Sequence, residues 1–345
     1  MTATMQAVHF YAPKDIRLVE VPVPEPGPGE ALLKIEAALT CGTDFKAFRR
    51  GHAVMLPHPP CPFGHEAAGV IAKLGRGAEK LFSEGQRVTV GDSAPCETCF
   101  FCRNGQSPLC DNLKILCGAY AQYLLVPAGV LKHKTAAIPD TLDFSAAALA
   151  EPLACAVHAV QALAVSRGET AAVVGAGPMA LMLIQVLKAA GARVLVLGRS
   201  PENLARAQAA GADQAFSALA QNGVLSARQA ADGRGADAVF EAAGSPEAWQ
   251  NAFALARKGG RVCFFGGCAP NTQVPLDAHR VHYEELSLRG VFHHAPEHFH
   301  AAAALLAQGK IKTELLISGR VALSELPKFF QDNAERSIPK AAVIP

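Results

Sequence analysis

The sequence predicts an α/β protein in two parts, a β-rich part of Greek-key or barrel-like type and a doubly wound parallel sheet. Three observations predict this fold class. The chain has 345 residues, which is more than a single hydrophobic core usually holds. Short apolar strands separated by Pro-Gly turns occupy residues 1–90. From about residue 170, apolar strands alternate with amphipathic helices, as in an open parallel sheet.

The first part is predicted from apolar runs that lie between turn-rich sequences such as PVPEPGPGE and LPHPPCPFG. Strands are expected at residues 6–10, 16–21, 31–39, 67–75 and 87–90. Short strands at this spacing are typical of a Greek-key or barrel-like domain.

The second part repeats a strand followed by a helix. Strands are expected at 171–175, 194–198, 237–244 and 261–267, and helices at 181–191, 201–211 and 246–260. After about residue 288 the sequence becomes irregular again. We expect this last piece to fold back onto the first part.

Composition excludes several classes of function. Half of the residues are apolar and 18% are charged, as in a globular protein. The net charge is +2 and there are no long basic runs, so the sequence predicts no basic surface that would bind nucleic acid or an anionic membrane. The apolar stretch AAALAEPLACAVHAVQALAV is interrupted by Glu151, Pro152 and His158, which favours a buried helix over a membrane span. Residues 1–20 lack a signal-peptide pattern, so ten cysteines indicate metal binding or free thiols in a reducing cytoplasm.

Four closely spaced cysteines predict a metal site. They follow the spacing C-x2-C-x2-C-x7-C and are Cys96, Cys99, Cys102 and Cys110. Four thiolates on a turn-rich loop fit tetrahedral zinc with a closed shell, which is structural rather than catalytic. An iron–sulfur cluster would use the same ligands, but ferredoxin-like runs have other spacings. We therefore predict a structural zinc lobe over about residues 91–117.

A glycine-rich turn predicts a dinucleotide site. In VVGAGPMALM, Gly175 allows a tight turn after a strand, and Gly177 lets the backbone approach a pyrophosphate. Pro178 and Met179 open the next helix, and the small Ala180 lets that helix pack on the strand.

The end of the following strand bears on the choice of cofactor. An NAD site normally has an acidic residue about 20 residues after the glycines. This chain has Gly198, followed by Arg199 and Ser200. A missing carboxylate and an added guanidinium favour the 2′-phosphate of NADP over NAD. The alternative interpretation of Arg199 is a solvated arginine at a loop tip.

A second set of metal-binding side chains lies in CGTD, which contains Cys41, and in GHE, which contains His65 and Glu66. A thiolate, an imidazole and a carboxylate with an open position would make a catalytic zinc site. Taken singly, Cys41 could be a core thiol and His65 a loop histidine. Glu151 adds a buried acid that needs a partner, and Pro152 suits the first turn of a helix with Glu151 at its N-terminus.

With CGTD, GHE, the four-cysteine lobe, EPL and GAGPMA in this order, the chain resembles the zinc-containing medium-chain dehydrogenases over essentially its whole length. Within them it is similar to the polyol branch, which includes sorbitol and threonine dehydrogenases. The resemblance implies a GroES-like catalytic domain from residues 1–155 and 289–345 and a Rossmann domain from 156–288. It also implies an active site in the cleft between them.

The resemblance also implies roles for the site residues. The catalytic zinc would be held by four side chains, with the two carboxylates acting directly or through water: Cys41, His65, Glu66 and Glu151. Thr43 would place its hydroxyl against the substrate oxygen and pass on the proton, and Asp44 would orient the ligating histidine. Zinc would acidify the alcohol, and hydride would pass to the nicotinamide.

Four residues at three places depart from the family pattern. Lys46 stands where many relatives carry a proton-relaying histidine, and it could relay protons only with a pKa depressed by burial; otherwise it would contact cofactor phosphates or lie exposed. His293 and His294 stand where polyol dehydrogenases carry an Arg-Tyr pair, so they are candidate substrate residues or packing residues at the domain boundary. Cys155 lies near the position of the later zinc cysteine of simple alcohol dehydrogenases and is the alternative to Glu151.

The sequence thus predicts a zinc-dependent oxidoreductase that transfers hydride between NADP, favoured over NAD, and a polyol, sugar or secondary alcohol. It predicts one catalytic and one structural zinc per chain, a small-molecule substrate, no nucleic acid and no membrane partner. By resemblance we expect a homo-oligomer, tetramer or dimer, in the cytoplasm. The alternatives are a zinc-free quinone or enoyl reductase of the same fold and a non-catalytic nucleotide-binding protein.

Overall fold

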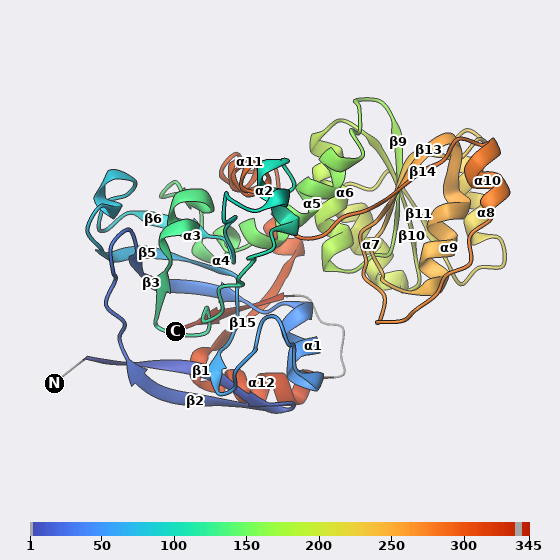
Figure 1. Cartoon of the computed structure of the whole chain (residues 1–345). Helices are drawn as coiled ribbons and strands as arrows, with labels where there is room; N and C mark the ends of the chain where they lie inside the picture. Colours follow the sequence, from blue (N-terminus) through green and yellow to red (C-terminus); the bar gives the residue numbers. More distant parts are fainter. Residues whose placement is uncertain (1–2, 335–339) are drawn as a thin grey trace. The chain divides into compact units, whose positions relative to one another are not determined.

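The computed structural model describes residues 3–334 and 340–345, and the chain divides into two compact units, each drawn in Figure 1. Unit 1 consists of Met1–Ala154, His294–Gly309 and Ile317–Pro345. Unit 2 consists of Cys155–His293 and Lys310–Leu316. The chain therefore leaves unit 1 within helix α5 (Ala150–Ala162) and returns to it between two adjacent histidines.

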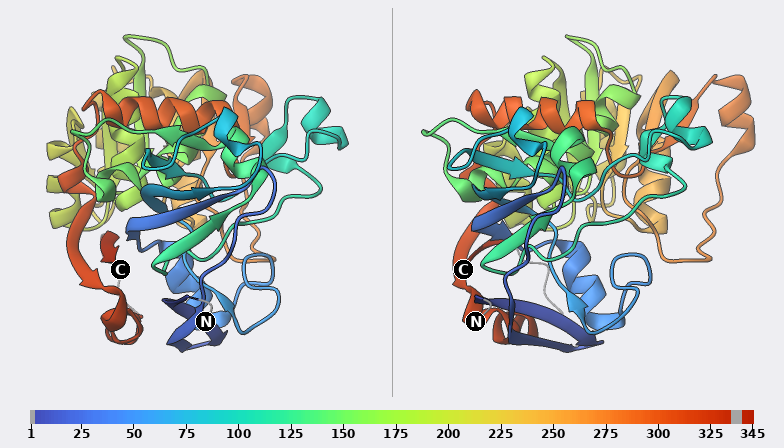
Figure 2. Two further views of the ribbon diagram at one scale, coloured as in Figure 1. Left: turned by 90° about the vertical axis from the view of Figure 1, so that its left-hand side faces the viewer. Right: turned by 60° about the vertical axis from the view of Figure 1, so that its left-hand side comes forward.

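Unit 1 is built mainly from antiparallel strands. Its larger sheet has the order β15 (Ile317–Ala322), β16 (Lys340–Ile344), β3 (Ala31–Leu39), β5 (Ala67–Leu74), β6 (Arg87–Val90) and β8 (Thr135–Ala137), with β7 (Tyr123–Val126) paired to β3. A smaller sheet has the order β2 (Asp15–Pro22), β1 (Thr4–Ala12) and β4 (Cys61–Pro62). Figure 2 shows from two sides how β16, near the end of the chain, lies in the same sheet as β3. This confirms the predicted GroES-like β fold.

An aromatic core fixes the first helix of unit 1. Phe330 of α12 (Leu326–Asn333) stacks on Phe45 of α1 (Gly42–Arg50) at 4.5 Å between ring centroids and meets Phe48 of α1 at 5.6 Å. Phe63 approaches the same ring at 5.6 Å. Such aromatic pairs contribute about 0.5–1.5 kcal/mol each beyond their buried area. They hold α1, and with it the CGTD motif, against the sheet. The remaining helices of unit 1 are α2 (Phe100–Arg103), α3 (Ala128–His133), α4 (Phe144–Ala147) and α11 (Pro296–Ala307).

Unit 2 contains a parallel sheet with the order β11 (Gln214–Ser217), β10 (Arg193–Gly198), β9 (Thr170–Val174), β12 (Ala236–Glu241), β13 (Ala256–Phe264) and β14 (Ser287–Gly290). In chain order this is 3-2-1-4-5-6, the order of a Rossmann fold, so the predicted doubly wound sheet is confirmed. The order reverses between β9 and β12. Ligands of such sheets bind at this reversal, outside the carboxyl ends of the strands.

The helices of unit 2 begin where the sequence places a cap followed by proline. Ser200 caps α7 (Pro201–Ala209) by accepting the N–H of Asn203 at 3.4 Å, and Ser245 caps α9 (Pro246–Leu255) in the same way. Pro opens each helix because the first turn needs no backbone donor. The other helices of the unit are α6 (Pro178–Ala189), α8 (Gly223–Ala230) and α10 (Ala278–Tyr283).

Two predictions along the chain were wrong. The helix expected over 246–260 ends at Leu255, because Ala256 adopts an extended conformation and begins β13 beside Ala236. Sheet pairing overrides the helical pattern there, and Arg257 donates to Asp237 at 2.6 Å. The segment after residue 288 is also not irregular, since α11 forms over Pro296–Ala307 with a proline at its first position.

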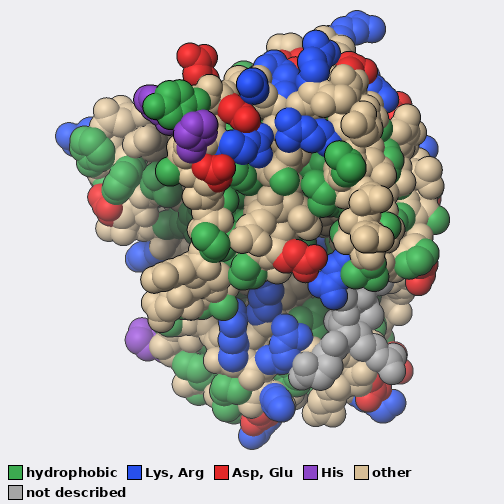
Figure 3. Space-filling view, turned by 90° about the vertical axis from the view of Figure 1, so that its right-hand side faces the viewer, with side chains coloured by type: hydrophobic (Ala, Val, Ile, Leu, Met, Phe, Trp, Pro, Cys, Tyr) green, Lys and Arg blue, Asp and Glu red, His purple; other side chains and the backbone are tan. Residues whose placement is uncertain are grey.

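The described residues contain no helix that is long and apolar enough to cross a bilayer. In the face drawn in Figure 3, acidic and basic side chains both occur, with hydrophobic ones scattered among them. This mixture agrees with the small net charge of +2.

Candidate active site

Strand pairing brings the CGTD and GHE motifs together in unit 1. β3 ends at Leu39 and β5 begins at Ala67, and in their antiparallel register Ala38 lies opposite Ala67. The Leu39 N–H also donates to the carbonyl of Glu66 at 3.1 Å. Cys41, which follows the end of β3, therefore lies close to the GHE motif, which precedes the start of β5. The potential ligand atoms of Cys41, His65 and Glu66 lie within 4.8 Å of one another.

Cys41 is also the N-cap residue of α1. Its Sγ accepts the N–H of Thr43 at 3.5 Å, and its own N–H donates to Asp44 at 3.1 Å. Burial raises the pKa of the Cys41 thiol, but the Lys340 ammonium and His65 more than offset this and lower it to about 7. The lowered pKa favours the thiolate, which is the form of cysteine that binds a metal.

Asp44 orients His65. Asp44 is fully buried, and its Oδ1 lies 3.0 Å from His65 Nδ1. Its Oδ2 accepts the hydroxyl of the buried Tyr120 at 2.5 Å. With Nδ1 facing a carboxylate, the His65 ring presents Nε2 toward Glu66, whose Oε1 lies 4.0 Å away. Sulfur, imidazole and carboxylate donors with a carboxylate behind the histidine are the donor set of catalytic zinc, so these residues fit the metal.

Lys340, which the sequence did not single out, completes the charge balance. Both residues of the Glu66–Lys340 pair are buried, and Lys340 Nζ lies 2.5 Å and 2.7 Å from the two carboxylate oxygens. The third donor goes to the Thr40 carbonyl at 3.2 Å. Burial raises the pKa of Glu66, and Lys340 opposes this shift. The sequence signal was weak: a single lysine that opens the apolar run KAAVIP.

Glu151 lies in the first turn of α5 and is only 5% exposed, as its position before Pro152 indicated. Its Oε1 lies 3.3 Å from His294 Nε2, and the same nitrogen lies 3.6 Å from Asp92 Oδ1. His294 is 1% exposed, so it faces two carboxylates inside unit 1. Cys155, one helical turn beyond Glu151, is half-buried.

The remaining candidates differ in exposure. Thr43 is half-buried at the start of α1, beside Cys41. Lys46, on the same helix, is exposed, so it lacks the burial that a proton relay would require. His293 is half-buried and has a positive φ of 55°, an uncommon conformation for a residue other than glycine.

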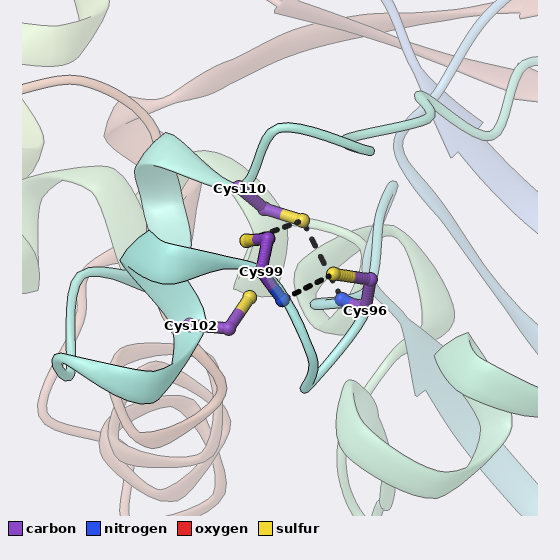
Figure 4. Close-up of side chains that lie close together, drawn as sticks. All are labelled: Cys96, Cys99, Cys102 and Cys110. Carbon is purple, nitrogen blue, oxygen red and sulfur yellow. Dashed lines mark hydrogen bonds between the residues drawn. The ribbon is translucent and has the colours of Figure 1, made fainter.

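The four-cysteine lobe forms a second metal-binding cluster. Its four sulfur atoms lie within 4.8 Å of one another, and Figure 4 shows them converging from a loop and the short helix α2. Cys99 Sγ and Cys110 Sγ are 3.9 Å apart, close to the about 3.8 Å that tetrahedral Zn–S bonds of 2.3 Å imply. Asn112 and Thr98 each donate to Cys96 Sγ at 3.5 Å. The geometry fits a closed zinc shell.

The glycine turn of unit 2 has the predicted geometry. Gly175 follows β9 with a φ of 115°, and a Cβ there would lie 3.2 Å from the backbone carbon of Ala242. Gly177 precedes α6 as its N-cap, and Pro178 opens the helix. Ala180 is fully buried between helix and sheet. The turn therefore presents a helix N-terminus to a pyrophosphate, without a side chain in the way.

The end of β10 is crowded at Gly198, the position where NAD sites carry an acidic residue. A Cβ on Gly198 would lie 2.9 Å from Leu204 Cδ2 and 3.0 Å from Ala176 Cβ. The next residue, Arg199, is exposed and makes no ion pair among the described residues. Ser200 is occupied as the cap of α7. Arg199 therefore offers a cation directly after β10, the strand that pairs with β9 and so lies next to the glycine turn.

Comparison with known proteins gives two family matches. Residues 27–139 match the alcohol dehydrogenase GroES-like domain, and residues 178–308 match the zinc-binding dehydrogenase domain. The two matches fall on the β-rich part and on the second part of the chain.

Individual relatives cover nearly the whole chain. A sorbitol dehydrogenase of Bacillus subtilis (strain 168) is 30% identical, over 97% of this chain and 94% of its own length. An L-galactonate-5-dehydrogenase of Escherichia coli (strain K12) is 31% identical, over 95% of each. A crystal structure from Sinorhizobium meliloti 1021, described as a zinc-binding dehydrogenase bound to NADP, is 31% identical with a TM-score of 0.92 over 100% of both chains.

Proposed function

Since this chain belongs to the polyol branch of the zinc-containing medium-chain dehydrogenases and is an oxidoreductase, we propose that it transfers hydride between NADP and a polyol, sugar or secondary alcohol. The observation that carries this proposal is the convergence of Cys41, His65 and Glu66 in unit 1, with Asp44 behind the histidine. The convergence favours a zinc enzyme over a zinc-free quinone or enoyl reductase, which has no use for these ligands.

We assign the catalytic metal to Cys41, His65 and Glu66, whose ligand atoms lie within 4.8 Å of one another. Glu151 lies outside this group and is the proposed further ligand, directly or through water, with Cys155 as its alternative. A zinc ion held there supplies a Lewis acid that acidifies an alcohol, and the dinucleotide supplies the hydride acceptor. Asp44 holds the His65 ring, so that one nitrogen remains available to the metal. Lys340 holds the Glu66 carboxylate and offsets its charge.

Thr43 is the proposed first proton acceptor from the substrate hydroxyl, because it lies next to Cys41 and carries a hydroxyl that both accepts and donates. Lys46 is exposed and therefore has the proposed role of a cofactor contact rather than a relay. His293 stays a candidate substrate residue. For His294, contact with Glu151 and Asp92 supports a role in holding the Glu151 carboxylate.

The proposed NADP preference rests on Arg199 and on the crowded Gly198. A relative of known structure is bound to NADP, which agrees with this preference. Replacing Arg199 with alanine is expected to raise the KM for NADP about 10- to 100-fold, because a charge-assisted contact to phosphate is worth about 1.5–3 kcal/mol. The KM for NAD should stay within about threefold, since NAD has no 2′-phosphate.

Steady-state kinetics with both cofactors test this prediction, and Arg193→Ala, an exchange of the arginine that begins β10, is the matched control. Equal changes in KM for NADP and NAD on removal of Arg199 would show that this side chain does not recognise the phosphate.

The substrate class is tested with a panel of polyols, sugar acids, sugars and secondary alcohols, each with NADP and NAD, and with zinc measured on the same sample. We expect turnover with at least one member that carries adjacent hydroxyls, as the names of the relatives indicate. Turnover by a zinc-free preparation, or reduction of quinones alone, would contradict the proposal.

Assembly and location are part of the same proposal. We propose a homo-oligomer, tetramer or dimer, that works in the cytoplasm on a small-molecule substrate, without nucleic acid or membrane partners. The mixed surface charge and the net charge of +2 support the absence of a nucleic-acid partner.

A further inference from the structure

A buried carboxylate lies at the carboxyl edge of the unit 2 sheet, beside the glycine turn. Glu241 is the last residue of β12 and is completely buried. Burial raises its pKa, and surrounding N–H groups oppose that shift. The hydride-transfer chemistry proposed above assigns it no role. A carboxylate taken from water without a charged partner costs several kcal/mol, so its hydrogen bonds must matter to the fold or to the site.

Glu241 holds two loops through both its side chain and its backbone. Its Oε1 accepts the N–H groups of Ala243 and Gly244, both at 2.7 Å. Its carbonyl oxygen accepts the N–H groups of Phe265 at 3.0 Å and Gly266 at 2.9 Å. The turn after β12 and the loop after β13 are therefore tied to one residue.

The packing of these loops leaves no space for side chains. A Cβ on Gly266 would lie 2.5 Å from Gly244 N and 2.6 Å from Glu241 Oε2. A Cβ on Gly244, which has a φ of 71°, would lie 2.7 Å from the Gly267 carbonyl oxygen. The two loops thus touch backbone to backbone, and Glu241 is the side chain that fits between them.

Residues 242–244 also pack against the glycine turn that contains Gly175. The Ala242 N–H donates to the Val174 carbonyl at 2.8 Å. A Cβ on Gly175 would lie 3.2 Å from the carbon and 3.3 Å from the nitrogen of the peptide that joins Ala242 to Ala243. Any displacement of residues 242–244 therefore moves the backbone against which Gly175 folds.

We propose that Glu241 is a positioning residue for the dinucleotide: by holding residues 242–244 through Oε1 it fixes the backbone beside the pyrophosphate-binding turn and shapes the nicotinamide end of the site. The inference rests on the proposed function, because it assumes that a dinucleotide binds at this edge. What matters is the reach of the acceptor, since Oε1 accepts the N–H groups of both Ala243 and Gly244 at 2.7 Å.

The chain carries a built-in reporter of this region. Trp249 is the single tryptophan of the protein, and its Nε1 donates to the Gly266 carbonyl at 3.1 Å. Its ring stacks on Phe264, with 3.9 Å between centroids and 12° between planes. The fluorescence of Trp249 therefore reports the position of the loop after β13, and we expect it to change when NADPH binds at the proposed site.

The test compares E241D with E241Q in the full-length, zinc-loaded protein. E241D keeps the charge but is one methylene too short to reach both N–H groups, whereas E241Q keeps the reach and loses the charge. We expect NADPH, titrated against Trp249 fluorescence, to bind E241D about 10- to 100-fold more weakly, as for the loss of hydrogen bonds to a charged acceptor, and E241Q within about threefold of wild type. The KM for NADP should follow these changes, while the KM for the alcohol and the zinc content stay unchanged.

E247Q, an exchange of an exposed glutamate in the first turn of α9, is the matched control and should bind NADPH like wild type. E241A carries the same expectation as E241D and replaces it if that variant does not fold. Wild-type affinity in folded E241D or E241A, or an equal loss in E241Q, would overturn the inference. A wild-type protein that binds neither NADPH nor NADH would instead refute the proposed function.

Discussion

Cys41→Ala is expected to lower kcat by at least about a thousandfold, because losing a metal ligand removes Lewis-acid stabilisation of about 4 kcal/mol or more. The helix that Cys41 caps should persist, since Asp44 remains in the first turn of α1 and Phe45 and Phe48 still pack on Phe330. The zinc content should fall to about half that of wild type. Metal analysis and kinetics on the same sample measure both effects.

Cys96→Ser provides the matched control, because it removes a thiolate from the other cluster. We expect Cys96→Ser to halve the zinc content too, but its main effect should be a lower thermal midpoint rather than a lower kcat. The reason is that four thiolates hold structural zinc with an apparent free energy of about 10 kcal/mol or more. A Cys41→Ala protein that keeps all its zinc and its turnover would refute the assignment of the catalytic site to unit 1.

Lys340→Met is expected to destabilise unit 1 by about 3–5 kcal/mol, because it leaves the buried Glu66 without its cationic partner. The thermal midpoint should fall by about 6 °C or more. The double variant Lys340→Met with Glu66→Gln should recover most of this loss, since a neutral amide costs less to bury than an unpaired carboxylate. Thermal unfolding of the three proteins measures the coupling between the two residues.

Lys34→Met is the control for charge removal alone. Lys34 pairs with Glu36 at 2.9 Å on the exposed face of β3, where an ion pair is worth about 0–1 kcal/mol. If Lys340→Met were no less stable than Lys34→Met, the pair between Glu66 and Lys340 would not carry the stability assigned to it.

The features that the sequence predicted well are those whose residues lie close together along the chain. The four cysteines fall within residues 96–110, so their spacing alone defines a ligand cluster. The glycine turn is equally local, because a strand, a tight turn and a helix opened by Pro178 follow one another directly. Glu151 was recognisable because an acid in an apolar helix requires a partner.

The features that the sequence did not predict depend on contacts between distant segments. Tyr120 donates to Asp44 across 76 residues, and nothing local distinguishes it from other tyrosines of unit 1. Glu241 resembles any strand-end acid until β13 places Gly266 beside it. The end of α9 at Leu255 depended on sheet pairing with Ala236, which helical periodicity does not register.

The pairing of β16 with β3 has a consequence for how the protein is made. Glu66 and Lys340 are separated by 274 residues, so at about 5–20 residues per second the ribosome delivers the lysine roughly 15–55 s after the glutamate. During that interval Glu66 lacks the Lys340 ammonium that pairs with it, and until the chain end is made the larger sheet of unit 1 lacks β16. Cellular zinc that reaches the nascent chain meets a complete four-cysteine lobe well before it meets a finished catalytic pocket. If both zinc ions bind as proposed, we expect metal loading to follow the order of synthesis, with the structural ion bound first and the catalytic ion last.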